Sequence, residues 1–184
     1  FHKTFIKTEY DAEHGAILAT KVMWDLPDGR KSHWNRDWEY VAFHSASIMP
    51  SGFDTDKRDF IGRHGTVGNP KAVREGKTSG HTGRWGDAIG SLCVEITLEP
   101  NEYKTVDFTI GAADTRESAL EIVDRFKDAA QVSQADETVV QFWRELTQRL
   151  QVKTPDVPLT TMGNSWLAYQ AISLGPARAC QPVE

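Results

Sequence analysis

The first third of the chain has the residue pattern of β-strands. Residues 4–10, 15–23 and 38–45 are rich in β-branched and aromatic side chains, and turn-forming residues separate them at 11–15 and 26–29. Short runs of this kind that follow one another closely predict antiparallel strands.

Two later runs, residues 91–98 and 103–110, alternate apolar with polar or small side chains. Residues 99–102 separate them and include the turn formers proline and asparagine. An alternating run on each side of a short turn predicts a β-hairpin.

A glycine-rich stretch, residues 61–90, lies between these two groups and contains eight glycines. Loops longer than roughly 12 to 15 residues are uncommon inside compact domains and are usually functional or disordered. We therefore expect a ligand to bind here. Trp85 could either fill a core or stack on a sugar ring. Six basic residues form either a solvated rim or a site for oxyanions or sugar hydroxyls: Arg58, Arg63, Lys71, Arg74, Lys77 and Arg84.

Helical periodicity begins after Gly111. Asp114, with Glu117 three residues later, resembles a capping box. One face of the helix that would follow is apolar and consists of Ala119, Ile122, Val123 and Phe126.

Two further helices are expected beyond this one. The second carries an apolar stripe made of Val139, Phe142, Trp143, Leu146 and Leu150. The third begins at Thr154-Pro155, with threonine as the N-cap, and runs through Met162, Trp166 and Tyr169. Strands that come first and helices that come last favour a β domain joined to a separate helical unit.

Composition narrows the function classes. The 184 residues carry a net charge of −5, which makes a nucleic-acid-binding surface unlikely as a function. No run approaches the roughly 18 apolar residues of a membrane span, so we expect a soluble protein. Two cysteines form no disulfide framework, which favours a reducing, cytoplasmic compartment. The chain opens on Phe1 inside a strand-like run, so we expect the natural polypeptide to continue upstream.

The histidines predict no metal site. They lie at positions 2, 14, 33, 44, 64 and 81, and no two of them have the spacing of a ligand pair on a helix or hairpin. Hydrogen-bonded structural or surface roles are the usual ones for isolated histidines, and we expect them for His14, His33 and His44. No cofactor is predicted.

Several segments, taken together and in order, resemble a known enzyme family. Residues 54–65, 69–73 and 79–83 resemble the sandwich-domain signature of the glycoside phosphorylases of family 94, which include cellobiose, chitobiose and cellobionic acid phosphorylases and the C-terminal part of cyclic β-1,2-glucan synthases. Further similar segments lie at 8–11, 15–19, 111–117, 152–156 and 164–170, so that the resemblance covers nearly the whole chain up to residue 173.

The resemblance implies a mainly β fold with C-terminal helices. Residues 1–112 would be the later part of an antiparallel β-supersandwich of the galactose mutarotase-like type, and residues 113–153 a helical linker. Residues 154–184 would hold the first helix of a truncated (α/α)₆ barrel. The family pattern is lost after Ser173, and Pro176 is expected to end a helix that should continue.

The resemblance also implies a function. The family releases a sugar 1-phosphate from a β-glucoside or β-1,2-glucan with inversion, and inorganic phosphate is the co-substrate of the full enzyme. The family's catalytic acid lies in the barrel, so no catalytic residue is assigned here and this chain alone is expected to be inactive. The candidate substrate-binding residues are Arg63, His64, Asn69, Trp85 and Asp87.

The expected partners are an oligosaccharide or glucan, the barrel domain, and a second copy of the chain in a homo-oligomer. The expected location is the cytoplasm, or the cytoplasmic part of a membrane-bound synthase. The alternative function is a non-catalytic carbohydrate-binding or oligomerising β module.

Overall fold

The structure is a computed structural model that describes residues 2–22, 38–149 and 151–179. The chain divides into two compact units, Phe1–Val132 and Ser133–Glu184. Each unit is described by itself. His33 and Leu150, which the sequence assigned to a structural role and to a helix stripe, lie outside the described residues.

A four-stranded antiparallel sheet forms the centre of the first unit. Its strands lie in the order β1-β2-β3-β6, and a short 3₁₀ helix at His2–Phe5 precedes them. The strands are β1 (Ile6–Asp11), β2 (Ala16–Lys21), β3 (Val41–Ala46) and β6 (Phe108–Ala113). The first three correspond to the three strands predicted from the sequence, which confirms that part of the prediction.

Helix α3 (Arg116–Arg125) covers one face of this sheet and closes the core. Leu18 and Phe43 face it from β2 and β3, and both are almost fully buried with Ala119 and Val123 of the helix. Burial of side chains of this size contributes roughly 1.5–3 kcal/mol each. The predicted apolar face of the helix is confirmed at Ala119, Val123 and the partly buried Ile122.

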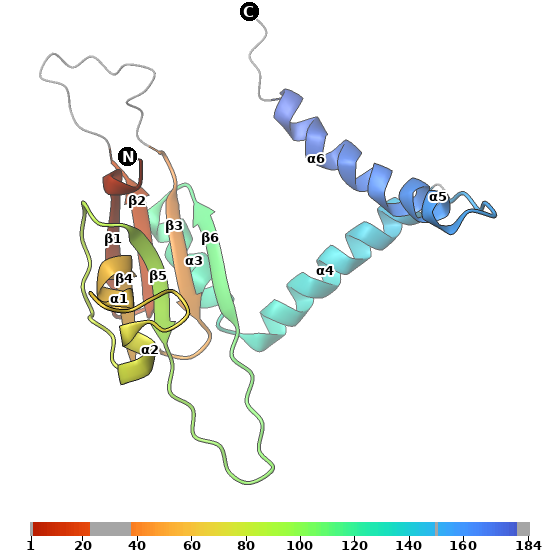
Figure 1. The fold of residues 1–184 in the computed structure, drawn as a ribbon. Helices are drawn as coiled ribbons and strands as arrows, with labels where there is room; N and C mark the ends of the chain where they lie inside the picture. Colours follow the sequence, from red (N-terminus) through yellow and green to blue (C-terminus); the bar gives the residue numbers. More distant parts are fainter. Residues whose placement is uncertain (1, 23–37, 150, 180–184) are drawn as a thin grey trace, which may run out of the picture. The chain divides into compact units, whose positions relative to one another are not determined.

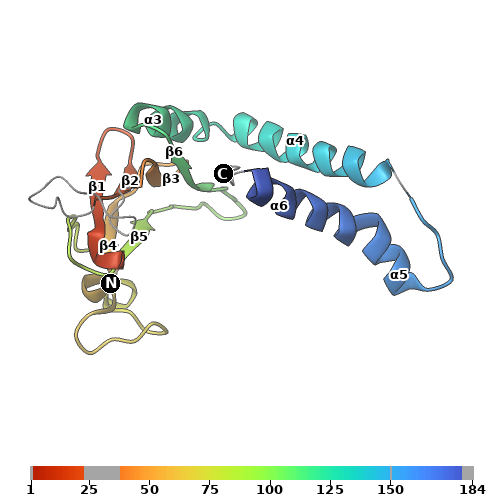
Figure 2. The same cartoon turned by 90° about the horizontal axis from the view of Figure 1, so that it is seen from above.

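The other face of the sheet carries a second, two-stranded layer. It consists of β4 (Gly52–Asp56) and β5 (Ala88–Cys93), and Figures 1 and 2 show it on the side opposite α3. Tyr10 of β1 stacks on Phe53 of β4 with ring centroids 3.9 Å apart. The predicted fold class, a supersandwich portion followed by helices, is therefore confirmed.

Two short helices belong to this region: α1 leads into the glycine-rich stretch, and α2 lies within it. Helix α1 (Lys57–Ile61) begins after Asp56, whose carboxylate accepts hydrogen bonds from the backbone N–H groups of Arg58 and Asp59. Helix α2 (Lys71–Glu75) ends at Gly76, which adopts the left-handed conformation at φ 60°. The loop predicted for residues 61–90 is thus partly ordered into helix.

The predicted hairpin of residues 91–98 and 103–110 is wrong. β5 pairs with β4 and β6 pairs with β3, so the two runs belong to different sheets. The turn between them does form, with the Glu102 N–H donating to the Glu99 carbonyl at 2.9 Å. The parts of the two runs that lie between β5 and β6 are exposed, and Tyr103 is 88% accessible. Two strands with neither face covered gain little stability from pairing.

The second unit is helical. It contains most of α4 (Ala129–Gln148), then α5 (Val157–Thr161), a π-helical turn at Met162–Trp166 and α6 (Leu167–Ala179). Tyr169 packs against Trp143 and Trp166 with ring centroids 5.9 and 5.7 Å apart. No helix in the described part of the chain is long and apolar enough to cross a membrane.

Three predicted helix boundaries are corrected. The N-cap of α3 is Thr115 rather than Asp114, because the Thr115 hydroxyl accepts the Ser118 N–H at 3.1 Å. The N-cap of α5 is Asp156 rather than Thr154, and it accepts the Leu159 N–H at 3.1 Å. Pro176 does not end α6, whose backbone stays helical to Ala179 because proline removes a single N–H donor from the helix.

Candidate functional site

A polar pocket of about 280 Å³ lies in the first unit, between β1 and the glycine-rich stretch. The end of β4, the start of α1 and residues 81–88 supply most of its walls. The residues that line it are Ile6, Thr8, Thr55, Asp56, Asp59, His81, Thr82, Gly83, Arg84, Gly86 and Ala88.

Two buried threonines form the floor of this pocket. Thr8 and Thr55 are 4% and 3% exposed, and their hydroxyl oxygens are 2.7 Å apart. The Thr55 hydroxyl donates to the His81 carbonyl at 2.7 Å, so Thr8 is the donor between the two threonines. Thr8 also accepts the Gly83 N–H at 3.1 Å. This hydrogen-bond relay fixes the loop backbone against β1.

Backbone pairing adds to the same attachment. Thr8 and Gly83 form an isolated antiparallel bridge, with N–H to carbonyl distances of 2.8 and 3.1 Å. On the far side of β4, the buried Asp54 carboxylate accepts the Ser79 N–H at 2.7 Å. The loop that carries residues 79–83 is therefore held at both of its ends by the strands.

The walls of the pocket carry charged groups. The Asp59 carboxylate lies 2.8 Å from Nδ1 of His81, which joins α1 to the loop. The Asp56 carboxylate lies against Gly86, because a Cβ at position 86 would be 2.0 Å from its Oδ2. Arg84 lines the same space and is exposed. Carboxylates accept hydrogen bonds and guanidinium groups donate them, so the pocket can bind a ligand rich in hydroxyls.

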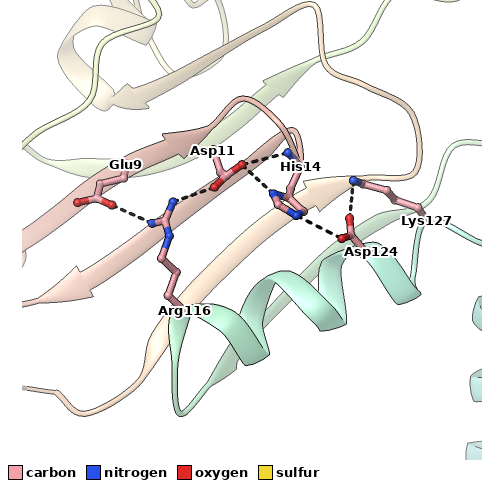
Figure 3. A network of polar contacts seen from close by, with 6 residues as sticks. All are labelled: Glu9, Asp11, His14, Arg116, Asp124 and Lys127. Atoms are coloured by element: carbon pink, nitrogen blue, oxygen red, sulfur yellow. Dashed lines mark hydrogen bonds and ion pairs between the residues drawn. The ribbon is translucent and has the colours of Figure 1, made fainter.

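A network of charges holds α3 to the opposite face of β1 (Figure 3). Arg116, the first residue of α3, donates to Glu9 at 3.0 Å and to Asp11 at 2.8 Å. His14 lies between Asp11 and Asp124, at 2.8 and 3.3 Å. The structural role predicted for His14 is confirmed, as it is for His44, whose Nδ1 lies 3.2 Å from the Thr109 carbonyl.

Two carboxyl groups of this network have shifted pKa values. The hydrogen bond from Lys7 lowers the pKa of Glu9, and the charges of Lys7 and Arg116 add to this and together outweigh the opposing effect of burial. Partial burial alone would raise the pKa of Asp11, but hydrogen bonds from His14 and the charge of Arg116 outweigh it and lower that pKa. Both groups are therefore held as carboxylates.

The side chains of β1 alternate between the two faces of the sheet, and each face has its own contacts. Glu9 and Asp11 face α3 and anchor it, whereas Thr8 and Tyr10 face the second layer and the pocket. The pocket floor and the network that holds α3 share one strand, so the packing of the domain fixes the position of the pocket.

The comparisons with known proteins agree with this architecture. The sequence model of the glycosyl hydrolase 94 supersandwich domain matches residues 1–129. The chain belongs to the glycosyl hydrolase 94 family.

Individual relatives of this family 94 chain are similar over most of its length. It is 31% identical over 170 residues to the cyclic beta-(1,2)-glucan synthase NdvB of Rhizobium meliloti (strain 1021), which covers 91% of this chain and 6% of that protein. It is 26% identical over 171 residues to the solabiose phosphorylase of Paenibacillus borealis, covering 93% and 21%. The N,N'-diacetylchitobiose phosphorylase of Vibrio proteolyticus is 28% identical over 135 residues, covering 73% and 17%. The chain therefore spans about a fifth or less of the length of these relatives.

The predicted substrate-binding residues of the supersandwich domain fall into two groups. Arg63, His64 and Asn69 lie on the exposed turn between α1 and α2, where Asn69 and Thr66 exchange backbone hydrogen bonds. Trp85 and Asp87 lie on the segment that leads into β5. Asp87 is tied to Lys57, whose backbone N–H donates to the Asp87 carbonyl at 2.9 Å.

Trp85 has an uncommon backbone conformation. Its φ is 73°, in the left-handed region that large side chains rarely adopt, and its ring packs edge-on against Phe5 with centroids 6.1 Å apart. Such strain costs of the order of 1–3 kcal/mol and tends to accumulate at functional sites. Its neighbours Arg84 and Gly86 both line the pocket.

The sequence did not single out the pocket itself. Thr8, Thr55, Asp56 and Asp59 were not predicted as site residues, although all four lie within segments that resemble the family. The signal that could have found them is the run Asp54 to Asp59, in which consecutive polar residues at the end of a strand lead directly into an N-capped helix. The bridge between Thr8 and Gly83 has no counterpart in local sequence.

Proposed function

We propose that this chain is the supersandwich scaffold of an inverting glycoside phosphorylase, and that it holds the sugar substrate through the glycine-rich stretch without itself supplying the proton donor. The observation that carries the proposal is the family 94 match over residues 1–129, together with relatives that are named as phosphorylases.

The reaction needs one acid and one nucleophile. A carboxylic acid protonates the glycosidic oxygen as its bond to the anomeric carbon breaks, and an oxygen of inorganic phosphate attacks that carbon from the opposite face. The products are a sugar 1-phosphate of inverted configuration and a free sugar. Phosphate is already an anion, so it needs positioned donors rather than a base.

The carboxyl groups with shifted pKa values here do not suit the role of acid. A proton donor needs a raised pKa, whereas the pKa values of Glu9 and Asp11 are lowered and both side chains are held by Arg116. The parts proposed for this chain are to fix the loop and to contact sugar. Arg63, His64, Asn69, Trp85 and Asp87 remain the proposed contacts, with a catalytic domain and a second copy of the chain as partners.

Phosphorus NMR tests this proposal. The purified 184-residue chain is incubated with inorganic phosphate and, separately, sophorose, cellobiose and N,N'-diacetylchitobiose. We expect the phosphate signal to stay unchanged and no sugar 1-phosphate to form. Conversion of phosphate by the chain alone would overturn the division of roles. Release of free sugars without phosphate consumption would overturn the phosphorylase assignment.

A further inference from the structure

We propose that the pocket between β1 and residues 81–86 binds one pyranose ring of the glycan, with Asp56 and Asp59 accepting hydrogen bonds from its hydroxyls and Arg84 donating to them. This inference rests on the proposed function and adds to it a site that the sequence did not identify.

Hydrogen bonds within the protein hold the pocket in place. Its floor consists of Thr8 and Thr55, which are almost fully buried. They form hydrogen bonds to each other and to the backbone of His81 and Gly83 in the loop. One wall is tied by the 2.8 Å contact between His81 and Asp59. Preorganised walls favour binding because little conformational entropy is lost when the ligand enters.

The groups left over have the pattern that a sugar requires. Oδ1 of Asp56 is used to cap α1, and Oδ2 of Asp59 contacts His81, which leaves one carboxylate oxygen on each residue. Within the described part of the chain, the Arg84 guanidinium has no ion-pair partner. A sugar hydroxyl donates and accepts at once, so two acceptors and one forked donor match neighbouring hydroxyls of one ring.

The charge and size of the pocket argue against other ligands. Two carboxylates face one guanidinium, which disfavours an anion such as phosphate. A metal ion is disfavoured because the described residues include no group of three His, Cys, Asp or Glu side chains that could hold one. The volume of about 280 Å³ lies near the lower end of small-molecule sites and suits a single ring better than an extended oligosaccharide.

Gly86 keeps the site open. A methyl group at this position would lie 2.0 Å from Oδ2 of Asp56 and would displace the carboxylate from the place where it meets the ligand. Gly86→Ala is therefore a steric probe of the pocket that removes no polar group.

Isothermal titration of the full chain with sophorose and with glucose tests the assignment. We expect saturable binding of both sugars by the unaltered protein and no comparable binding of inorganic phosphate. Asp59→Asn and Arg84→Ala should each weaken sugar binding about tenfold, the effect expected from the loss of one charge-assisted hydrogen bond. Gly86→Ala should abolish it. Arg144→Ala, which removes an exposed cation of α4, should leave it unchanged.

Thermal unfolding of each variant separates loss of the site from loss of the fold. If Gly86→Ala unfolds the domain, Asp59→Asn and Arg84→Ala decide, because neither residue is buried and neither change adds bulk to the core. If Arg63→Ala weakens sugar binding and the pocket variants leave it intact, this inference is overturned, while the proposed phosphorylase scaffold stands. Absence of saturable sugar binding, or preferential binding of phosphate, also overturns it. The phosphorus NMR assay tests the proposed function separately.

Discussion

The side chain of Arg116 joins helix α3 to strand β1. A single guanidinium group forms two hydrogen bonds to carboxylates of β1, and the fork of an arginine suits two acceptors in a way that a lysine cannot. The residue stands at the first position of α3, so its contacts fix where the helix begins to cross the sheet.

Replacement of Arg116 tests this role. Arg116→Ala should lower the free energy of unfolding by about 1–2 kcal/mol, because Asp11 is only 14% exposed and loses a charged donor. Urea unfolding followed by circular dichroism measures the change. The control is Lys127→Ala, which removes the more exposed pair with Asp124 and should cost about 0–0.5 kcal/mol. Equal effects of the two variants would contradict the role of Arg116.

The same carboxylates make stability depend on pH. The pKa values of Glu9 and Asp11 are lower in the folded protein than their usual 4.5 and 3.8. Their contribution to stability is therefore fully present above their usual pKa values and is lost as the pH falls through the lower folded pKa values. Unfolding measured from pH 7 to pH 3 should show this loss, and Asp11→Asn should flatten it. An unchanged profile in Asp11→Asn would refute the assignment.

At the scale of elements, β6 packs closely against Phe43 of β3. A Cβ on Gly111 would lie 2.6 Å from the Phe43 ring, so glycine at this position lets β3 and β6 pair beside a large aromatic residue. A side chain at this position would prevent the close approach to Phe43, which explains why a glycine lies inside the strand.

Substitution of this glycine has a sharp expectation. Gly111→Ala should destabilise the domain by about 1–3 kcal/mol through overpacking against Phe43. Gly68→Ala is the matched control, because its Cβ would have no neighbour within 4 Å, and it should change stability by less than about 0.5 kcal/mol. Thermal unfolding of the two variants measures both. A harmless Gly111→Ala would show that the ring has room to move.

The elements also show how far sequence reasoning reaches. Strands β1, β2 and β3 follow from runs of β-branched and aromatic residues between turn formers, and the buried face of α3 follows from the helical period of its apolar residues. The hairpin prediction failed because alternation reports which side is covered and not which strand is the partner. Caps shifted by one or two residues because several neighbouring residues could each cap the helix.

The candidate site was predicted only in part, for a related reason. The glycine-rich stretch supplies part of the pocket wall, and Trp85 lies between two residues that line the pocket. The floor could not be predicted because it depends on Thr8 meeting residues far along the chain, such as Gly83. Contacts of that kind are set by the pairing of strands and have no local pattern.

At the scale of the whole molecule, the two units differ in how much they bury. The first has its own core around Leu18, Phe43 and Val123. Of the second, residues 133–149 and 151–173 include none that is buried, and Phe142 and Trp166 are 51% and 55% exposed. Large exposed aromatic side chains such as these are typical of surfaces that another chain covers.

The expectation of a homo-oligomer can be tested on this basis. Light scattering should show the chain as a dimer or larger species, and Phe142→Glu should shift it toward the monomer. Val67→Glu changes a still more exposed apolar residue of the first unit, 77% accessible, and should leave the mass unchanged. A monomeric unaltered chain would remove the second copy from the proposed partners.

The central claim is that the first unit holds the sugar while the chain performs no chemistry on it. Amide NMR of the full chain during titration with sophorose tests this most directly, since every backbone N–H reports its own surroundings. The account predicts saturable shifts confined to the end of β4, α1 and residues 79–88, with sophorose recovered intact. Shifts centred on α4 or α6, or sophorose consumed together with phosphate, would contradict it.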